Sequence, residues 1–130
     1  MSSLSVIIVS YESGNTLDFC LATLKASLEG IDSEVIVWDN FSQKLSQEHF
    51  KSNYPWVKWI FHHENIGFGK ACNEASKLSV KENLVFLNPD TLCNGDSIRP
   101  LLFGLENILS YPMIFKSKPM PISDWEMHII

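Results

Sequence analysis

The chain has 130 residues, of which 45% are hydrophobic and 19% are charged, and its formal net charge is −5. This composition predicts one folded domain with a real core, and the acidic balance argues against nucleic acid as a partner. No apolar run approaches the roughly 20 residues that span a bilayer, and residues 1–5 lack the positive region of a secretory signal. The three cysteines are odd in number and lack CxxC spacing, so we expect buried free thiols in a cytoplasmic protein.

The N-terminal third predicts a strand followed by a helix. Leu4–Val9 is rich in Val and Ile without alternation, which is typical of a strand covered on both faces. A polar segment follows, and we expect Asn15 to cap the next helix with Asp18 in its first turn. Leucines then recur at helical spacing until Gly30, which is a suitable stop.

The same alternation of strands and helices continues along the chain. The remaining predicted strands are Glu34–Trp38, Val57–Phe61 and Asn83–Leu87. The remaining predicted helices are Ser42–Phe50, Lys70–Val80 and Gly95–Leu105. Such alternation predicts an α/β fold with a mostly parallel sheet flanked by helices on both sides.

Each predicted strand is followed by a polar cluster. The carboxyl ends of parallel strands meet at one edge of a sheet, and ligands of open α/β sheets bind in the crevice outside that edge. The clusters are Ser10–Glu12, Asp39–Asn40, His62–Gly69 and Asn88–Thr91. We therefore expect all four to contribute to one site.

The segment after the last strand is a candidate metal site. Asp90 and Asn88 offer hard oxygen ligands that suit Mg²⁺ or Mn²⁺, and such an ion would neutralise a diphosphate. Asn-Pro-Asp is also good turn chemistry, so an ordinary turn is the alternative.

Two other residues have more than one interpretation. Asp39 could accept a hydrogen bond from a base or a ribose hydroxyl, or it could cap a helix. Tyr11 could stack on a planar base, or it could be a boundary aromatic residue with its hydroxyl in water.

Gly67 and Gly69 do not complete a known phosphate-binding fingerprint. Cys72 occupies the third glycine position of the dinucleotide motif, and Ala71 stands where a phosphate-binding loop has Ser or Thr. These failures argue against another type of nucleotide enzyme that uses the sheet edge.

Four segments in this order resemble the family 2 glycosyltransferases of the GT-A fold. They are residues 6–13, 34–40, 65–73 and 86–91. The resemblance covers about residues 4–105, and the Asn-Pro-Asp form is similar to the bacterial branch that includes rhamnosyltransferases of surface-polysaccharide synthesis. Four ordered blocks are far more specific than any one of them.

The resemblance implies a set of donor-site residues. Those expected to bind the nucleotide sugar are Ser10, Tyr11, Glu12, Asp39, Asn40, Asn65, Asn73 and Asn88. Asp90 matches the carboxylate that holds the divalent ion, Mg²⁺ or Mn²⁺. Asn88 replaces an aspartate found in many members, which weakens the expected hold on the metal.

The resemblance also implies the reaction. We expect inverting, metal-dependent transfer of a sugar from a UDP- or dTDP-sugar to a glycan or lipid-linked acceptor in cell-surface polysaccharide synthesis. This places the chain in the cytoplasm, where it could associate with the inner face of the membrane.

The acceptor-binding part of the family lies beyond the metal motif, and only a short stretch follows that motif here. We therefore expect residues 1–130 to form a single domain that lacks the acceptor part. The catalytic base is unknown, and Asp124 and Glu126 are the only acidic pair in the remainder. The alternative is a non-catalytic nucleotide-binding remnant or interaction module. A sheet lacking its later strands would leave an unpaired edge that favours a homodimer.

Overall fold

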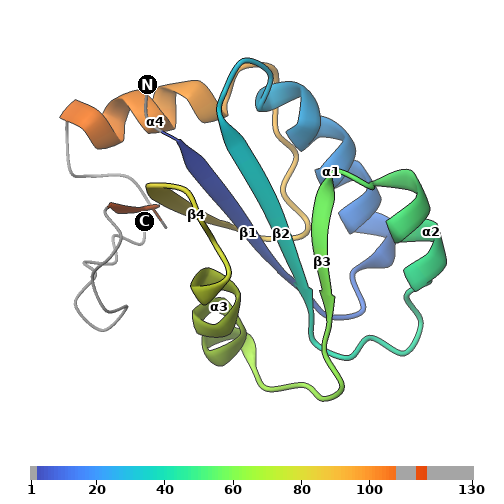
Figure 1. Cartoon of the computed structure of the whole chain (residues 1–130). Coiled ribbons are helices and arrows are strands. Elements are labelled where there is room, and N and C mark those ends of the chain that lie inside the picture. Colours follow the sequence, from blue (N-terminus) through green and yellow to red (C-terminus); the bar gives the residue numbers. More distant parts are fainter. Residues whose placement is uncertain (1–2, 108–113, 117–130) are drawn as a thin grey trace.

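The computed structural model describes residues 3–107 and 114–116, and their strands and helices alternate along the chain (Figure 1). The strands are β1 (Leu4–Ser10), β2 (Ser33–Asp39), β3 (Val57–Phe61), β4 (Asn83–Leu87) and β5 (Ile114–Lys116). The helices are α1 (Gly14–Ser27), α2 (Gln47–Asn53), α3 (Phe68–Lys77) and α4 (Ile98–Asn107). The predicted α/β class is confirmed.

The sheet has the strand order β3-β2-β1-β4-β5. The first four strands are parallel, and β5 pairs with β4 in the antiparallel direction. β1 lies at the centre, and all seven of its residues are buried, as the continuous apolar run predicts.

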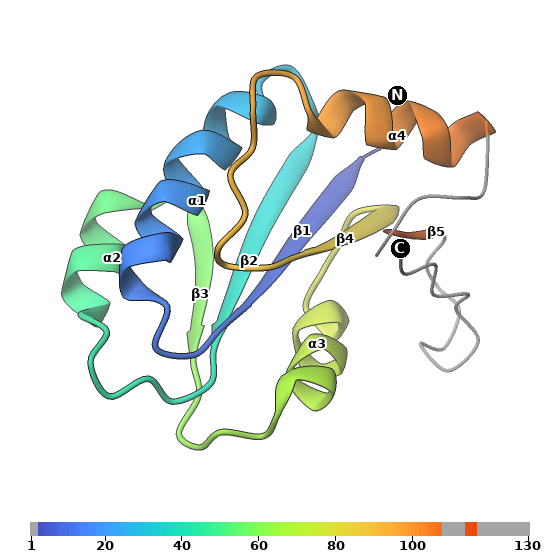
Figure 2. The ribbon, with the colours of Figure 1, turned by 180° about the vertical axis from the view of Figure 1, so that it is seen from behind.

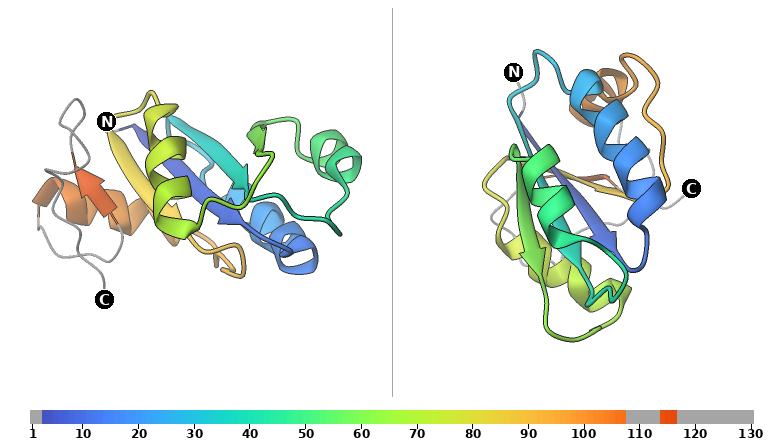
Figure 3. Two further views of the ribbon diagram at one scale, coloured as in Figure 1. Left: turned by 90° about the horizontal axis from the view of Figure 1, so that it is seen from below. Right: turned by 90° about the vertical axis from the view of Figure 1, so that its right-hand side faces the viewer.

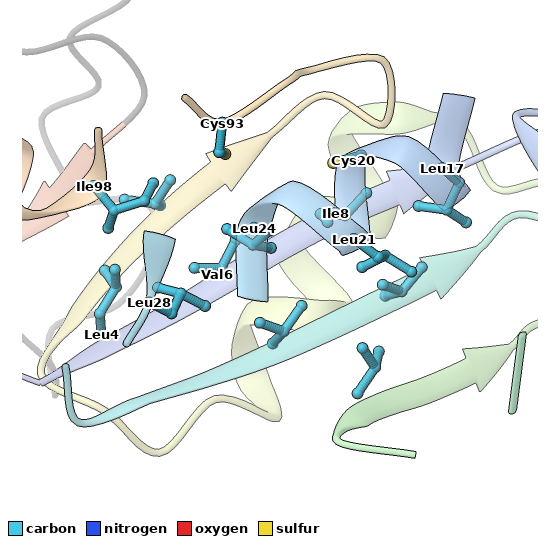
Figure 4. Packing of buried hydrophobic residues seen from close by; sticks show 14 of the residues in the cluster. Leu4, Val6, Ile8, Leu17, Cys20, Leu21, Leu24, Leu28, Cys93 and Ile98 are labelled. Carbon is cyan, nitrogen blue, oxygen red and sulfur yellow. The ribbon is translucent and has the colours of Figure 1, made fainter. Parts of the chain in front are cut away.

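The helices cover both faces of this sheet (Figures 2 and 3). On one face, α1, α2 and α4 pack over the even-numbered residues of β1, which include Val6 and Ile8. Figure 4 shows the leucines of α1 lying over these residues. On the opposite face, α3 packs its small residues Ala71 and Ala75 against Ile7. Small side chains let this helix lie close to the strands.

The structure corrects the predicted start of α1. The helix begins at Gly14, Ser13 is its cap residue, and no side chain caps it. The capping role of Asn15 was wrong, because Asn15 lies inside the helix. Asp18 lies near the start of the helix but bonds to another part of the chain. Its carboxylate accepts a hydrogen bond from the Tyr54 hydroxyl at 2.7 Å and lies 2.9 Å from Nε2 of His49.

The second predicted helix was placed too early in the chain. It spans Gln47–Asn53, and the Ser46 hydroxyl caps it by accepting from the His49 backbone N–H at 3.2 Å. Ser42 lies outside the helix, and its backbone N–H and hydroxyl both donate to the Asp39 carboxylate. The cap bond that begins the helix is made by Ser46 instead.

All three cysteines are buried and free, as predicted. In the part of the chain that the structure describes, no helix is long and apolar enough to cross a membrane.

Candidate functional site

The strand order creates a switch point between β1 and β4. The chain proceeds from β1 to β2 to β3 in one direction and then returns to the other side of β1 to form β4. In such sheets, ligands bind outside the carboxyl ends of the strands at this point. The register aligns these ends, because Ser10 of β1 pairs with Asp39 of β2, which pairs with Phe61 of β3. Figure 1 shows the loops after β1, β2 and β3 at one end of the sheet.

Asp39 joins the loops that follow β1 and β2. It is 2% exposed, and its two carboxylate oxygens accept from the Ser42 N–H at 2.8 Å and the Ser42 hydroxyl at 2.6 Å. The Ser42 hydroxyl oxygen in turn accepts from the Glu12 N–H at 2.7 Å, and a Glu12 carboxylate oxygen accepts from the Lys44 N–H at 3.0 Å. Asp39 and Glu12 therefore hold the two loops against each other.

Two residues of these loops adopt left-handed backbone conformations without being glycine. Glu12 has φ 52° and Phe41 has φ 68°. Such conformations are costly for residues with a side chain, and they cluster at functional sites. The Asn40 N–H donates to the Ser10 carbonyl at 2.8 Å, which joins the two loops just before both strained positions.

Asn40 connects the end of β2 to the loop before α3. It is 3% exposed, and its side-chain oxygen accepts from Nε1 of Trp38 at 3.1 Å and from the Ile66 N–H at 3.4 Å. Its amide donates to the Gly67 carbonyl at 3.2 Å. Asn65 shapes the same loop by accepting from the Gly67 N–H at 2.9 Å. Gly67 itself has φ 83°, which explains the requirement for glycine there.

The end of β4 forms a turn that carries the predicted metal ligand. The Thr91 N–H donates to the Asn88 carbonyl at 3.1 Å, with Pro89 at the second position of the turn. Asn88 and Asp90 are both exposed. Among the described residues, the Asp90 carboxylate has no hydrogen-bond or ion-pair partner. The turn is thus real, and it presents the carboxylate to solvent.

The buried thiol of Cys20 lies beneath this turn. Burial, then the nearby Cys93 and the Asp90 carboxylate, raise the pKa of the Cys20 thiol to about 12. The Cys20 sulfur lies 3.8 Å from the Asn88 carbonyl oxygen. A buried, protonated thiol therefore lies against the backbone of this turn.

Ser10 ends β1 with an unusual hydroxyl. It is fully buried, and its Oγ has no hydrogen-bond partner among the described residues. Buried polar groups are normally paired, so an unpaired one at a strand end marks a place where a further group can bind.

The structure thus assembles most of the predicted donor residues. Hydrogen bonds connect the loops that carry Ser10, Tyr11, Glu12, Asp39, Asn40 and Asn65, and Asn88 and Asp90 follow the adjoining strand. Asn73 is different, because it is exposed in the middle of α3 and has no hydrogen bond to these loops. Sequence reasoning missed Ser42, whose position three residues after Asp39 was the available signal.

A metal would have few protein ligands here. Within residues 3–107 and 114–116, no group of three His, Cys, Asp or Glu side chains could hold a metal ion. Asp90 and Asn88 nevertheless present a carboxylate and an amide oxygen, which are the hard donors that Mg²⁺ and Mn²⁺ accept, and both ions commonly take further oxygens from phosphates.

Two hollows lie at the amino end of the sheet, away from these loops. One, of about 170 Å³, includes Leu28, Val35 and Trp56 in its lining, and the other, of about 360 Å³, includes Gly30 and Arg99. Neither contains a predicted donor residue.

Comparison with protein families gives one match that covers most of the chain. The model described as "Glycosyl transferase family 2" matches residues 5–121. A comparison with curated proteins finds no match.

Comparison with solved structures identifies similar folds. S. aureus TarS 1-349 in complex with UDP-GlcNAc has a TM-score of 0.70 and 24% identity, covering 80% of this chain and 31% of that chain. Mannosyltransferase PcManGT from Pyrobaculum calidifontis, in complex with GDP-Man and Mn²⁺, has a TM-score of 0.65 and 19% identity, covering 73% of this chain and 29% of that chain. The chain thus spans about a third of the length of these neighbours.

Proposed function

The chain belongs to glycosyl transferase family 2 and has the GT-A fold, and we propose that it binds a nucleotide sugar at the carboxyl edge of its sheet. The observation that carries the proposal is the convergence of polar loops at the switch point between β1 and β4, with Asp90 exposed and unpaired among the described residues. The neighbours solved with UDP-GlcNAc and GDP-Man support this class of ligand.

In this proposal, the loops after β1 and β2 hold the nucleoside. Tyr11 stacks on the base, and the buried hydroxyl of Ser10 gains a partner from the ligand or from water bound with it. Asp39 positions Ser42 and Glu12, and because a carboxylate has about four acceptor sites, it retains capacity for the N–H of a base. Asn40 and Asn65 support the neighbouring loop.

Asp90, with Asn88 beside it, would hold Mg²⁺ or Mn²⁺ against the diphosphate. The ion, when bound, supplies electrostatic stabilisation of the departing nucleoside diphosphate. Asp90 suits this role because its carboxylate is exposed and has no competing partner among the described residues. Asn73 has the least support in the proposed donor set, since it lies within α3 and has no hydrogen bond to the loops among the described residues.

The proposed reaction is inverting transfer from a UDP- or dTDP-sugar, including dTDP-rhamnose, to a glycan or lipid-linked acceptor of cell-surface polysaccharide. An acceptor hydroxyl attacks the anomeric carbon, the bond to the diphosphate breaks, and a base takes the hydroxyl proton. Asp124 and Glu126, the acidic pair considered for this base, lie outside the described residues. We place the reaction in the cytoplasm, at the inner face of the membrane.

A second candidate function is nucleotide-sugar binding without transfer. The observation behind this candidate is that Asp124 and Glu126 lie beyond residue 121, where the family match ends, so no residue within the match is assigned as the base. A donor-hydrolysis and transfer assay with UDP- and dTDP-sugars separates the two candidates, because a binding remnant would release no nucleoside diphosphate.

Calorimetry with UDP, dTDP and GDP, each with and without Mn²⁺, tests the proposed binding. We expect Mn²⁺ to increase the affinity of the wild-type chain, and Asp90→Asn to lose most of that increase while keeping its fold. Asp96→Asn is the matched control, because Asp96 is also exposed but pairs with Arg99 away from the predicted donor residues. No Mn²⁺-dependent affinity in the wild type would refute the proposal, and equal loss in both variants would refute the role of Asp90.

We also propose that the chain forms a homodimer. In the part of the chain that the structure describes, β3 pairs only with β2, so one of its edges is free to pair with a second copy. Light scattering at several concentrations tests this, and a single monomeric mass throughout would contradict it.

A further inference from the structure

Aromatic side chains are exposed around the carboxyl edge of the sheet. Four Phe or Tyr residues are exposed in the described chain, and three of them follow β1, β2 and β3. These are Tyr11, Phe41 and Phe68, which are 54%, 48% and 52% exposed. The fourth, Phe19, is 67% exposed on α1. Large rings left half in water at one edge are available to contact a ligand.

Phe41 is the least expected of these residues. Its φ of 68° is a backbone conformation that glycine adopts freely and that a bulky residue adopts at a cost. Burial of the ring does not compensate for this strain, because the ring remains about half exposed. Phe41 therefore places a phenyl ring at a backbone conformation that favours glycine.

Hydrogen bonds place Phe41 beside Tyr11. The Asn40 N–H donates to the Ser10 carbonyl at 2.8 Å, and the Glu12 N–H donates to the Ser42 hydroxyl at 2.7 Å. These two bonds flank the pair, so the backbones of Tyr11 and Phe41 run side by side between them. No aromatic ring of the described chain stacks on either one, and both rings are therefore open to a ligand.

We propose that Phe41 contacts the nucleobase of the bound sugar nucleotide, next to Tyr11. This inference rests on the proposed function, and it adds a base-contacting residue that the sequence did not single out. Every nucleobase has a planar π-face, and stacking or edge contacts with aromatic rings stabilise bound bases. The hydrogen bonds of Asp39, Ser42 and Glu12 hold the strained loop, so the ring is already in position before the base arrives.

Ring deletion tests the contact. Calorimetry compares UMP, which carries the base, with pyrophosphate and Mn²⁺, which lack it. We expect Phe41→Ala to weaken UMP binding about five-fold or more, as base–aromatic stacking predicts, and to leave pyrophosphate binding unchanged. Phe19→Ala is the matched control, since it removes an exposed ring of the same size from α1, and it should bind both ligands as the wild type does.

Two further variants separate ring contact from backbone strain. Phe41→Gly removes the ring and accepts the left-handed conformation, so it should melt a few degrees above Phe41→Ala yet bind UMP equally weakly. Phe41→Tyr keeps an aromatic face and should restore UMP binding to near the wild-type value.

The outcomes distinguish failure of the proposed nucleotide-sugar binding from failure of the Phe41 contact alone. If the wild type binds neither UMP nor pyrophosphate with Mn²⁺, the proposed function fails and the contact fails with it. If the wild type binds UMP and Phe41→Ala binds it equally well, only the role of Phe41 fails. A variant that loses pyrophosphate and UMP to the same extent would also overturn the inference, because the loss would then come from a displaced loop.

Discussion

The two ends of the parallel sheet are built in different ways. At the amino end, polar groups pair with one another: the Glu34 carboxylate accepts from the Ser5 hydroxyl at 2.5 Å and the Val80 N–H at 2.7 Å, and Lys81 contacts Asp32 at 2.6 Å. At the carboxyl end, non-glycine residues have positive φ, and a buried hydroxyl and an exposed carboxylate have no partner in the described chain. Backbone strain and unpaired polar groups cluster at functional sites, so this contrast supports the proposed site at the carboxyl end of the sheet.

The largest expected effect on the free energy of unfolding comes from a substitution in the hydrophobic core, on which both ends of the sheet depend. Leu21 is fully buried in the core between α1 and the sheet. Leu21→Ala should lower the free energy of unfolding by about 2–5 kcal/mol, because it removes a buried side chain and leaves a cavity. Urea denaturation measures this, with the exposed Phe19→Ala on the same helix as the control. Equal losses in the two variants would mean that α1 does not pack as described.

Two carboxylates, one at each end of the sheet, test whether only the carboxyl end takes part in binding. Asp39 at the carboxyl end accepts two hydrogen bonds from Ser42, and Glu34 at the amino end accepts one each from Ser5 and Val80. Removing either by substitution with Ala should lower the free energy of unfolding by about 1–3 kcal/mol, because donors lose their partners. Only Asp39→Ala should also weaken UDP binding. Calorimetry beside urea denaturation checks both statements, and reduced UDP affinity in Glu34→Ala would break the contrast.

Unfolding at alkaline pH tests the burial of the Cys20 thiol beneath the Asn88–Thr91 turn. Burial raises the pKa of Cys20 from 9.0 to about 12, so above pH 9 the unfolded chain loses this proton before the folded chain does. The stabilisation from the protonated thiol is complete below pH 9 and is lost as pH rises toward 12, by about 1 kcal/mol at pH 10. Urea denaturation at pH 7.5 and pH 10 measures the loss. Cys20→Ala should show a smaller decrease, and an unchanged decrease would argue against this thiol as a source.

The smallest expected effect is a gain in the free energy of unfolding, whereas the substitutions above lower it. Ser10→Ala removes a buried hydroxyl that has no partner in the described chain, so it should raise the free energy of unfolding by up to about 1 kcal/mol and weaken UDP binding. Ser5→Ala, on the same strand, should instead destabilise the fold, because the Ser5 hydroxyl donates to Glu34. If Ser10→Ala destabilises the fold as Ser5→Ala does, the hydroxyl has a partner in the free protein.

The sequence was informative wherever the signal is local and apolar. The first four strands lie within a residue or so of their predicted bounds, because continuous Val and Ile runs identify buried strands. Parallel order then made the convergence of the polar loops predictable. The antiparallel β5 was not predicted, since its three residues carry no pattern of their own.

The errors come from side-chain bonds that no local pattern reports. Asp18 was expected to serve its own helix, but it bonds Tyr54, which is 36 residues away. The second helix was placed too early because the Ser46 hydroxyl, and not Ser42, caps its first turn. Phe41 was missed because its left-handed backbone is normally signalled by glycine or asparagine.

The burial of Cys20, Cys72 and Cys93 has a practical consequence, because these are the only thiols of the chain. Burial also raises the pKa of Cys72 to about 11, so native thiols should react slowly with maleimides near neutral pH. Gln43→Cys would then provide a single reactive position on an exposed residue beside Ser42. A fluorophore attached there could report arrival of a nucleotide in real time without removing any native cysteine.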